Sequence, residues 1–462
     1  MPDHDDAPAA PRGPLDRLLS LFGDVRGGEG LGAALLALNA FVLLFAYYLL
    51  KPVREALIVG GVGPEIKAYT AALQALLLLF LIPAYGRFSS RVSRIRLITW
   101  VTLFFVSNLA VFYVLGRSKA LDLGIPFYVW VGIFNVMLVA QFWAFVNDVY
   151  VPEQGRRLIA LIAIGSSTGG IFGSWTAKLL IKAIGVYSPM LIAGAMLLVC
   201  IAISRLVHTR SGAAHGLRGQ AVDRETPLGR DGGFQLIWKQ RYLLLIALLI
   251  LMLNAVNTTG EYILGKAVRT AADQALLPGT VADPDAFRKQ FVGLFYADFQ
   301  FWVNLCSALA QLLLVSRIMT WFGVRAALFV LPLIALGGYG LIATAPLLGL
   351  IGVIKGVKIA ENSTDYSLNN TARHALFLPT SREAKYKAKA AIDSFFWRMG
   401  DLTSAGLVFV GSRLHLDARG FAGVNFAFTL VWLWIVIRVA REHRKLAGES
   451  STAPAAEASA PA

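Results

Sequence analysis

Residues 31–60 have the sequence LGAALLALNAFVLLFAYYLLKPVREALIVG, a long apolar run with a Lys-Pro-Val-Arg-Glu cluster near its end. As an α-helix this run would extend roughly 45 Å, which exceeds the hydrocarbon thickness of a bilayer, about 30 Å. The run therefore predicts a membrane-spanning helix. Because the helix overshoots, Lys51, Arg54 and Glu55 are expected in the outer half of the bilayer, where Pro52 can kink it.

Apolar runs of this kind recur along the whole chain. Of its 462 residues 56% are hydrophobic and 15% are charged, whereas soluble domains carry roughly a quarter charged residues because their surface faces water. The sequence predicts an all-α polytopic membrane protein. About twelve transmembrane helices are expected, at 35–58, 68–86, 97–115, 125–147, 158–182, 187–206, 241–264, 290–316, 324–344, 346–362, 388–411 and 420–438.

The predicted spans divide into two sets of six that resemble each other. A proline and a basic stretch precede both the fifth span, after Pro152, and the eleventh, after Pro379. Such an internal repeat is typical of transporters that consist of two related halves, and it favours a major facilitator-like fold. Two six-helix bundles are expected, at 31–206 and 241–440, joined by a cytoplasmic linker at 207–240. Disordered cytoplasmic tails are expected at 1–30 and 441–462.

The net charge of +15 is explained by topology. With the amino terminus inside, most Lys and Arg fall on the inner side, which predicts cytoplasmic termini and argues against nucleic acid as a partner. Cys200 and Cys306 lie in apolar runs and the six histidines are scattered. Neither a disulfide framework nor a metal site is predicted, and we expect no cofactor.

A run of small residues, Gly165–Ser174, lies in the fifth span, but it lacks the Gly-Lys-Ser/Thr ending of a phosphate-binding loop. Small residues let transmembrane helices approach closely. Close helix packing is the favoured interpretation, although a place along the solute pathway is compatible with it.

Ionisable and amide side chains inside the apolar spans are the candidate site residues, because each is costly in lipid and must face a partner or a wet cavity. Cations suit phosphate or carboxylate groups of a solute. Snorkelling at a membrane surface and internal ion pairs, such as Arg398 with Asp401, are the alternatives for single residues. The candidate substrate-binding residues are Lys51, Arg54, Glu55, Asn147, Asp148, Lys178, Glu261, Lys358, Glu361, Asn362, Asp365, Arg398 and Asp401.

Three stretches of the sequence resemble the ATP/ADP translocases, the nucleotide transporters of plastids and intracellular bacteria. Tyr48–Val59 resembles the family's first-helix signature, and Phe142–Asp148 its Phe-Trp-x-Phe-x-Asn-acid pattern. Asp365–Asp393 matches in order and spacing over about thirty residues, and the resemblance spans nearly the whole membrane domain. It implies a bacterial inner-membrane antiporter that exchanges nucleotides by alternating access.

Carried over residue by residue, the family's first-helix substrate lysine falls on Arg54 and its seventh-helix glutamate near Glu261. Two positions depart from the pattern. The fourth-helix glutamate falls on Val131, and the eleventh-helix lysine falls on Asp401, with Arg398 one turn away. The departures put ATP/ADP exchange itself in doubt while the fold is expected to be retained.

Two other functions therefore remain open from the sequence. One is a proton-coupled carrier of another small organic anion or peptide-like solute, which the Val131 and Asp401 departures favour. The other is a membrane enzyme acting on a lipid-linked substrate, for which the sequence offers no catalytic constellation. The sequence does not indicate the oligomeric state.

Overall fold

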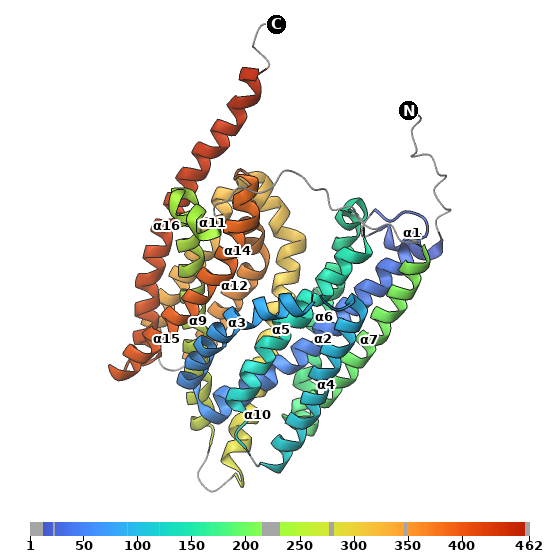
Figure 1. The fold of residues 1–462 in the computed structure, drawn as a ribbon. Helices are drawn as coiled ribbons and strands as arrows, with labels where there is room; N and C mark the ends of the chain where they lie inside the picture. Colours follow the sequence, from blue (N-terminus) through green and yellow to red (C-terminus); the bar gives the residue numbers. More distant parts are fainter. Residues whose placement is uncertain are drawn as a thin grey trace. The chain divides into compact units, whose positions relative to one another are not determined.

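A computed structural model describes residues 13–21, 24–89, 91–119, 121–150, 152–214, 232–276, 281–345 and 349–457. Throughout these ranges the secondary structure is helical and there is no strand, so the all-α prediction is confirmed (Figure 1). The α-helices are α1 (Pro14–Leu19), α2 (Gly30–Glu55), α3 (Pro64–Ser89), α4 (Arg94–Ser118), α5 (Gly124–Val149), α6 (Pro152–Ile184), α7 (Ser188–Ala214), α8 (Gly233–Lys239), α9 (Arg241–Gln274), α10 (Pro284–Ala310), α11 (Ser316–Thr344), α12 (Leu350–Thr364), α13 (Asn370–Ala375), α14 (Lys389–Ala391), α15 (Trp397–Arg413) and α16 (Ala418–Glu457).

Wider π-helical turns interrupt this helical chain at five places. They occupy Ala56–Val62, Gln311–Val315, Asp365–Asn369, Ala384–Ala388 and Ile392–Phe396. The first follows the Lys51–Glu55 cluster directly. Single π-turns within α-helices are often found at functional sites. Of the candidate site residues, Asp365 lies in one of these turns and Glu55 directly precedes another.

Nine helical stretches among the described residues are long and apolar enough to cross a membrane. One of them, Pro284–Thr344, has 61 residues and is twice the length that a bilayer needs. Gly323 divides it with a φ of 74°, a backbone conformation that glycine adopts without strain. Because the tenth and eleventh predicted spans are short or interrupted in the structure, the count of twelve stays a prediction.

By its internal packing the chain forms two compact units. Unit 1 contains Met1–Leu57, Pro83–Gln220 and Lys289–Phe301, and unit 2 contains Ile58–Ile82, Ala221–Arg288 and Trp302–Ala462. The predicted bundles were contiguous halves of the sequence. In the structure α3 and α10 are instead divided between the units, so a sequence boundary near the middle of the chain describes the organisation only in part.

In unit 1, α2 packs mainly against α6 and α7, and these three helices lie side by side in Figure 1. A stripe of glycines on α6 makes the closest approach. A Cβ atom on Gly165, Gly169 or Gly173 would collide with the backbone of α2, at Ala37, Phe41 and Phe45 respectively. The interpretation of this run as a close-packing surface is therefore confirmed.

In unit 2, α9 is the central helix and packs against α12, α15 and α16, while α11 packs against α16. Gly400 on α15 lies so close to α9 that an added Cβ would be 2.7 Å from the Cβ of Asn254. This contact brings the polar residues of α15 onto the polar face of α9.

The described parts of the predicted tails and linker contain helices. Within 1–30, α1 packs on the start of α2: the buried carboxylate of Asp16 accepts hydrogen bonds from the backbone N–H groups of Gly28 and Gly30, at 3.1 and 2.8 Å. The amide of Gly30 is one of the groups that the start of a helix leaves unsatisfied. Within 207–240, α8 is helical, and α16 continues past residue 441 to Glu457. The division of the chain into tails, bundles and linker stays a prediction.

Candidate functional site: two charged clusters

The first cluster lies in unit 1 at the end of α2. Glu55 accepts two hydrogen bonds from Arg54, from Nε at 3.0 Å and from Nη2 at 2.5 Å. The guanidinium also lies over the ring of Tyr128 on α5, 4.7 Å from its centroid, a distance typical of a cation–π contact. One turn earlier Lys51 donates to Oε1 of Gln300 on α10 at 3.1 Å.

All of these groups are withdrawn from solvent. The side chain of Arg54 is 14% exposed and that of Glu55 is 2% exposed. A guanidinium has five N–H donors, and among the described residues only those on Nε and Nη2 of Arg54 have hydrogen-bond acceptors. Arg54 can therefore bind a further anionic oxygen without releasing Glu55.

Three other candidates of unit 1 have other partners or surroundings than Arg54. Lys178 on α6 forms an ion pair with Asp298 on α10 at 2.5 Å. Asp148 forms an exposed ion pair with Arg94 on α4 at 2.6 Å, and Asn147 beside it is exposed. Since Tyr128 lies near the opposite end of α5, Asn147 and Asp148 are about 30 Å from it along the helix. The structure does not bring them together with Arg54.

The second cluster lies in unit 2 around Lys358 of α12, which is fully buried. Its ammonium group donates to Oε2 of Glu361 at 2.9 Å and to Oδ1 of Asn257 on α9 at 2.8 Å. The hydroxyl of Tyr339 on α11 donates to the same Glu361 oxygen at 2.8 Å. Three helices thus enclose one cation and one carboxylate.

Glu261 of α9 connects this buried pair to the surrounding polar groups. Its Oε1 accepts a hydrogen bond from Asn362 at 2.9 Å and lies 3.8 Å from the ammonium of Lys358. Its Oε2 lies 3.7 Å from the ammonium of Lys67 on α3. The side chain of Glu261 is 24% exposed, against 1% for Lys358, so this carboxylate is the more accessible end of the network.

Asp401 and Arg398 on α15 form the ion pair that the sequence suggested, with a separation of 3.6 Å. Asp401 also accepts from Asn254 at 2.8 Å and from Thr258 at 3.1 Å, both on α9. These bonds fasten α15 to α9. Asp365 accepts from Asn369, one turn away in its own helix, at 2.7 Å.

Sequence reasoning missed several members of both clusters. Four of them are neutral side chains within apolar spans: Tyr128, Gln300, Asn257 and Tyr339. The polar atom of each, inside an apolar run, was the signal in the sequence that could have indicated a site residue. Lys67 was placed just before the second span and treated as a loop residue, whereas it is buried one turn inside α3.

The chemistry of these clusters is that of anion binding and ion pairing. No group of three or more His, Cys, Asp or Glu side chains suited to a metal ion occurs in the described part of the chain. Arginine and lysine beside aromatic rings, amides and carboxylates can hold a phosphate or carboxylate of a solute, and the carboxylates can hold the cations when no solute is bound.

Comparison with known proteins gives one family. The TLC ATP/ADP transporter family matches residues 125–443. The "ADP,ATP carrier protein 1" of Chlamydia trachomatis is 23% identical over 342 residues, 65% of this chain, and the match spans 61% of the length of that relative. The protein of the same name from Chlamydia pneumoniae is 22% identical over 500 aligned positions, covering 91% of this chain and 93% of its own.

Among solved structures the similarity is one of fold. A bacterial homologue of the iron transporter ferroportin, in an inward-facing state, has a TM-score of 0.59 at 14% identity and covers 88% of this chain and 98% of its own. The POT family transporter PepTSo has a TM-score of 0.59 at 10% identity and covers 90% of this chain and 98% of its own. The fold is therefore major facilitator-like, as predicted.

The sequence match and the apolar helices agree with a multi-pass membrane protein of a transporter family. The alternative of a membrane enzyme acting on a lipid-linked substrate is wrong, because the matching family consists of carriers. The chain belongs to the TLC ATP/ADP transporter family.

Proposed function

We propose that this transporter exchanges a nucleotide, or a related phosphorylated anion, across the bacterial inner membrane by alternating access. The relatives named as ADP,ATP carriers favour this class of cargo. The observation that carries the proposal is the Arg54 site, because a buried guanidinium with unused donors and one carboxylate neighbour is suited to a phosphate.

In this proposal Arg54 and Lys51 are the cations of unit 1 that contact the phosphates. Tyr128 keeps the guanidinium plane oriented and presents an apolar, desolvated surface beside it. Desolvation strengthens the interaction between an arginine and a phosphate, because less water competes for the same donors.

In unit 2, Glu261 is the residue that we expect to respond to the solute. It is the more exposed carboxylate of its network and lies near Lys67 and Lys358. An arriving anion would compete with Glu261 for these cations. Lys358 itself is enclosed by Glu361 and Asn257, so we assign it to holding the network together.

We further propose that both termini are cytoplasmic, as the distribution of Lys and Arg indicates. Single cysteines near Asp24 and near Arg444 should then be protected from a membrane-impermeant thiol reagent in intact cells and become labelled after permeabilisation. Labelling in intact cells would contradict this orientation.

The decisive test is uptake of radiolabelled ATP and ADP into proteoliposomes, with and without unlabelled nucleotide inside. We expect saturable uptake that is accelerated by internal nucleotide and that has a lower apparent affinity, by roughly tenfold or more, in Arg54→Gln. Protein-free liposomes and the Arg441→Gln variant, altered on the exposed surface of α16, are the controls. Absence of counterflow for every nucleotide tested would contradict the nucleotide proposal.

A proton-coupled carrier of another organic anion is the second candidate. Val131 is fully buried in the apolar core of unit 1, so this position of α5 supplies no carboxylate. Uptake that depends on a pH gradient and is lost in Asp401→Asn would favour proton coupling. Exchange that is independent of pH, with Asp401→Asn still active, would exclude it.

A further inference from the structure

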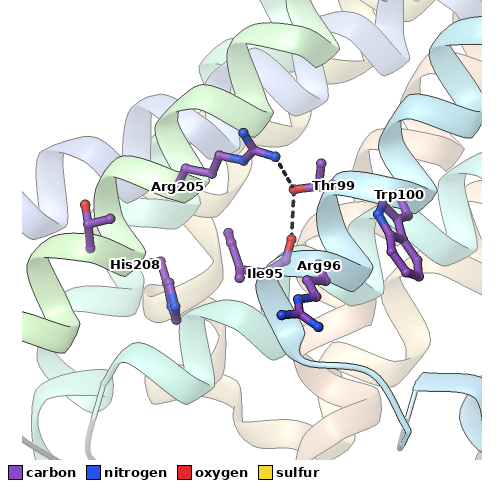
Figure 2. A pocket seen from close by; sticks show the side chains of 7 residues that line it. Ile95, Arg96, Thr99, Trp100, Arg205 and His208 are labelled. Carbon is purple, nitrogen blue, oxygen red and sulfur yellow. Dashed lines mark hydrogen bonds between the residues drawn. The ribbon is translucent and has the colours of Figure 1, made fainter.

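A hollow opens between the start of α4 and the later part of α7, both in unit 1 (Figure 2). Its volume is about 340 Å³, at the lower end of the range for small-molecule sites, roughly 300–1,000 Å³. Figure 2 shows the guanidinium of Arg205 extending from α7 toward Thr99 on α4, with Arg96 and His208 on the two sides of the hollow. None of its lining residues belongs to the charged cluster of unit 1.

The surface of the hollow is almost entirely apolar, and basic side chains are among the residues that line it. The ionisable lining residues are Arg96, Arg205 and His208, and none of the seven described lining residues is acidic. The hydroxyl of Thr99 accepts one long hydrogen bond from Arg205, at 3.5 Å. Within the described part of the chain, Arg96 and His208 have neither a hydrogen-bond nor an ionic partner. Two arginines thus keep most of their donors for a ligand.

The outer surface of α4 continues from this hollow as a strip of exposed apolar side chains. Trp100 at its edge is 58% exposed, and Leu103 and Phe104 in the next turn are 45% and 59% exposed. On α7, Leu206, Val199 and Leu198 are also exposed. In a membrane protein such a surface is covered by acyl chains, and a tryptophan at its end is typical of the headgroup level.

We propose that this hollow binds the phosphate of an anionic phospholipid, with the acyl chains lying along the apolar strip of α4 and α7. The phosphodiester is held by Arg96 and Arg205, and His208 lines the same hollow for its ester or glycerol oxygens. The hydroxyl of Thr99 already donates to the carbonyl of Ile95, at 2.8 Å. Basic pockets between transmembrane helices are suited to such headgroups. A soluble phosphate would use the same cations but would gain nothing from the apolar strip.

The test uses full-length protein in dodecyl maltoside and titrates short-chain phosphatidylglycerol or phosphatidylcholine, with bound lipid counted by native mass spectrometry. We expect phosphatidylglycerol to bind more tightly than phosphatidylcholine. The variant R96Q/R205Q should bind phosphatidylglycerol roughly thirtyfold more weakly, since each basic group near an anionic lipid contributes on the order of a fivefold gain. The variant R441Q/R444Q removes the same charge from α16 and should bind like the original protein.

Two further measurements separate lipid from soluble phosphate and binding from misfolding. Inorganic phosphate at the same concentration should not displace the lipid, and Trp100→Ala should weaken lipid binding without changing the elution profile of the protein. Equal affinity of R96Q/R205Q and R441Q/R444Q for phosphatidylglycerol would overturn the proposal. Displacement by inorganic phosphate at matched concentration would also overturn it.

Discussion

Arg54 in unit 1 and Lys358 in unit 2 are both cations withdrawn from water, but the two units hold them in different ways. Arg54 has one carboxylate and one aromatic ring as neighbours and retains donors. Lys358 is enclosed by Glu361, Asn257 and Glu261. The comparison indicates that burial alone does not identify a solute-binding cation. A buried cation whose hydrogen-bond donors are all occupied by protein groups stabilises the fold and has no donor left for a solute.

The two sites are also positioned by different forces. The helix that carries Arg54 is fixed by backbone contact with the glycine stripe of α6. The helices around Lys358 are connected by ion pairs and by amide and phenol hydrogen bonds. Perturbing polar groups should therefore damage unit 2 more, and perturbing packing should damage unit 1 more.

The largest effect is expected for Lys358→Met. Removing one partner of a buried ion pair costs about 3–5 kcal/mol, because it leaves the other charge uncompensated. The thermal unfolding temperature of purified protein in detergent should fall sharply. The double variant K358M/E361M should recover most of the loss, since both charges are removed. If the double variant is as unstable as the single one, the pair is not what holds this cluster together.

The next largest effect is expected for Arg54→Gln, measured as nucleotide transport. Hydrogen bonds to charged groups contribute about 1.5–3 kcal/mol, so apparent affinity should fall by roughly tenfold or more. Arg54→Lys keeps the charge but loses the planar fork and the ring contact, and should be intermediate. Thermal stability should change much less than in Lys358→Met. Unchanged uptake with Arg54→Gln would assign the unit 1 site a structural role.

A smaller effect is expected for Gly169→Ala, which tests the packing side of the comparison. The new methyl group would meet the carbonyl of Phe41, and overpacking of this kind costs about 1–3 kcal/mol. The matched change Gly406→Ala on α15 points into open space and should be neutral or stabilising by at most about 1 kcal/mol. Equal stabilities of the two variants would show that α2 and α6 can separate freely.

The smallest effect concerns an ion pair at the start of α2. Partial burial raises the pKa of Glu29, but hydrogen bonds from Arg157 and from the backbone of Arg26 outweigh this and lower the pKa below its usual value. The pair therefore stabilises the protein at pH above the ordinary range of Glu, and this contribution is lost as pH falls through the lowered pKa.

Unfolding temperature as a function of pH, compared between the original protein and Glu29→Gln, measures this contribution. At neutral pH the free energies of unfolding of the two proteins should differ by about 1 kcal/mol or less. The two unfolding temperatures should therefore differ slightly at neutral pH and become equal in acid. A difference that grows as the pH falls would contradict the assignment. The pair belongs to unit 1, so a measured contribution would mean that ion pairing as well as packing stabilises that unit.

The fold could be predicted from the sequence because long apolar runs allow few structures other than membrane-spanning helices. The glycine stripe was likewise readable, since its spacing places small residues on one helical face. The short stretch around α12 and the segment before α15 were harder. There, polar side chains break the apolar pattern, and their partners lie on other helices.

The candidate site was predictable only in part, for a related reason. Lys358, Glu361 and Asn362 lie within one turn of each other and were recognised together. Their contacts with Asn257 and Glu261 depend on how α9 packs against α12. Asn147 and Asp148 show the converse: they are conspicuous in the sequence, yet they lie at the other end of α5 from Arg54.

The division of α3 and α10 between the units has a consequence for biosynthesis. When the ribosome has completed residue 220, unit 1 still lacks Lys289–Phe301. The surface of unit 1 that packs against Lys289–Phe301 therefore stays uncovered in the membrane until this segment of the second half has been inserted. A gene split between residues 214 and 232 would yield two polypeptides that each lack a piece of their own unit, so co-expression would be needed for either to mature.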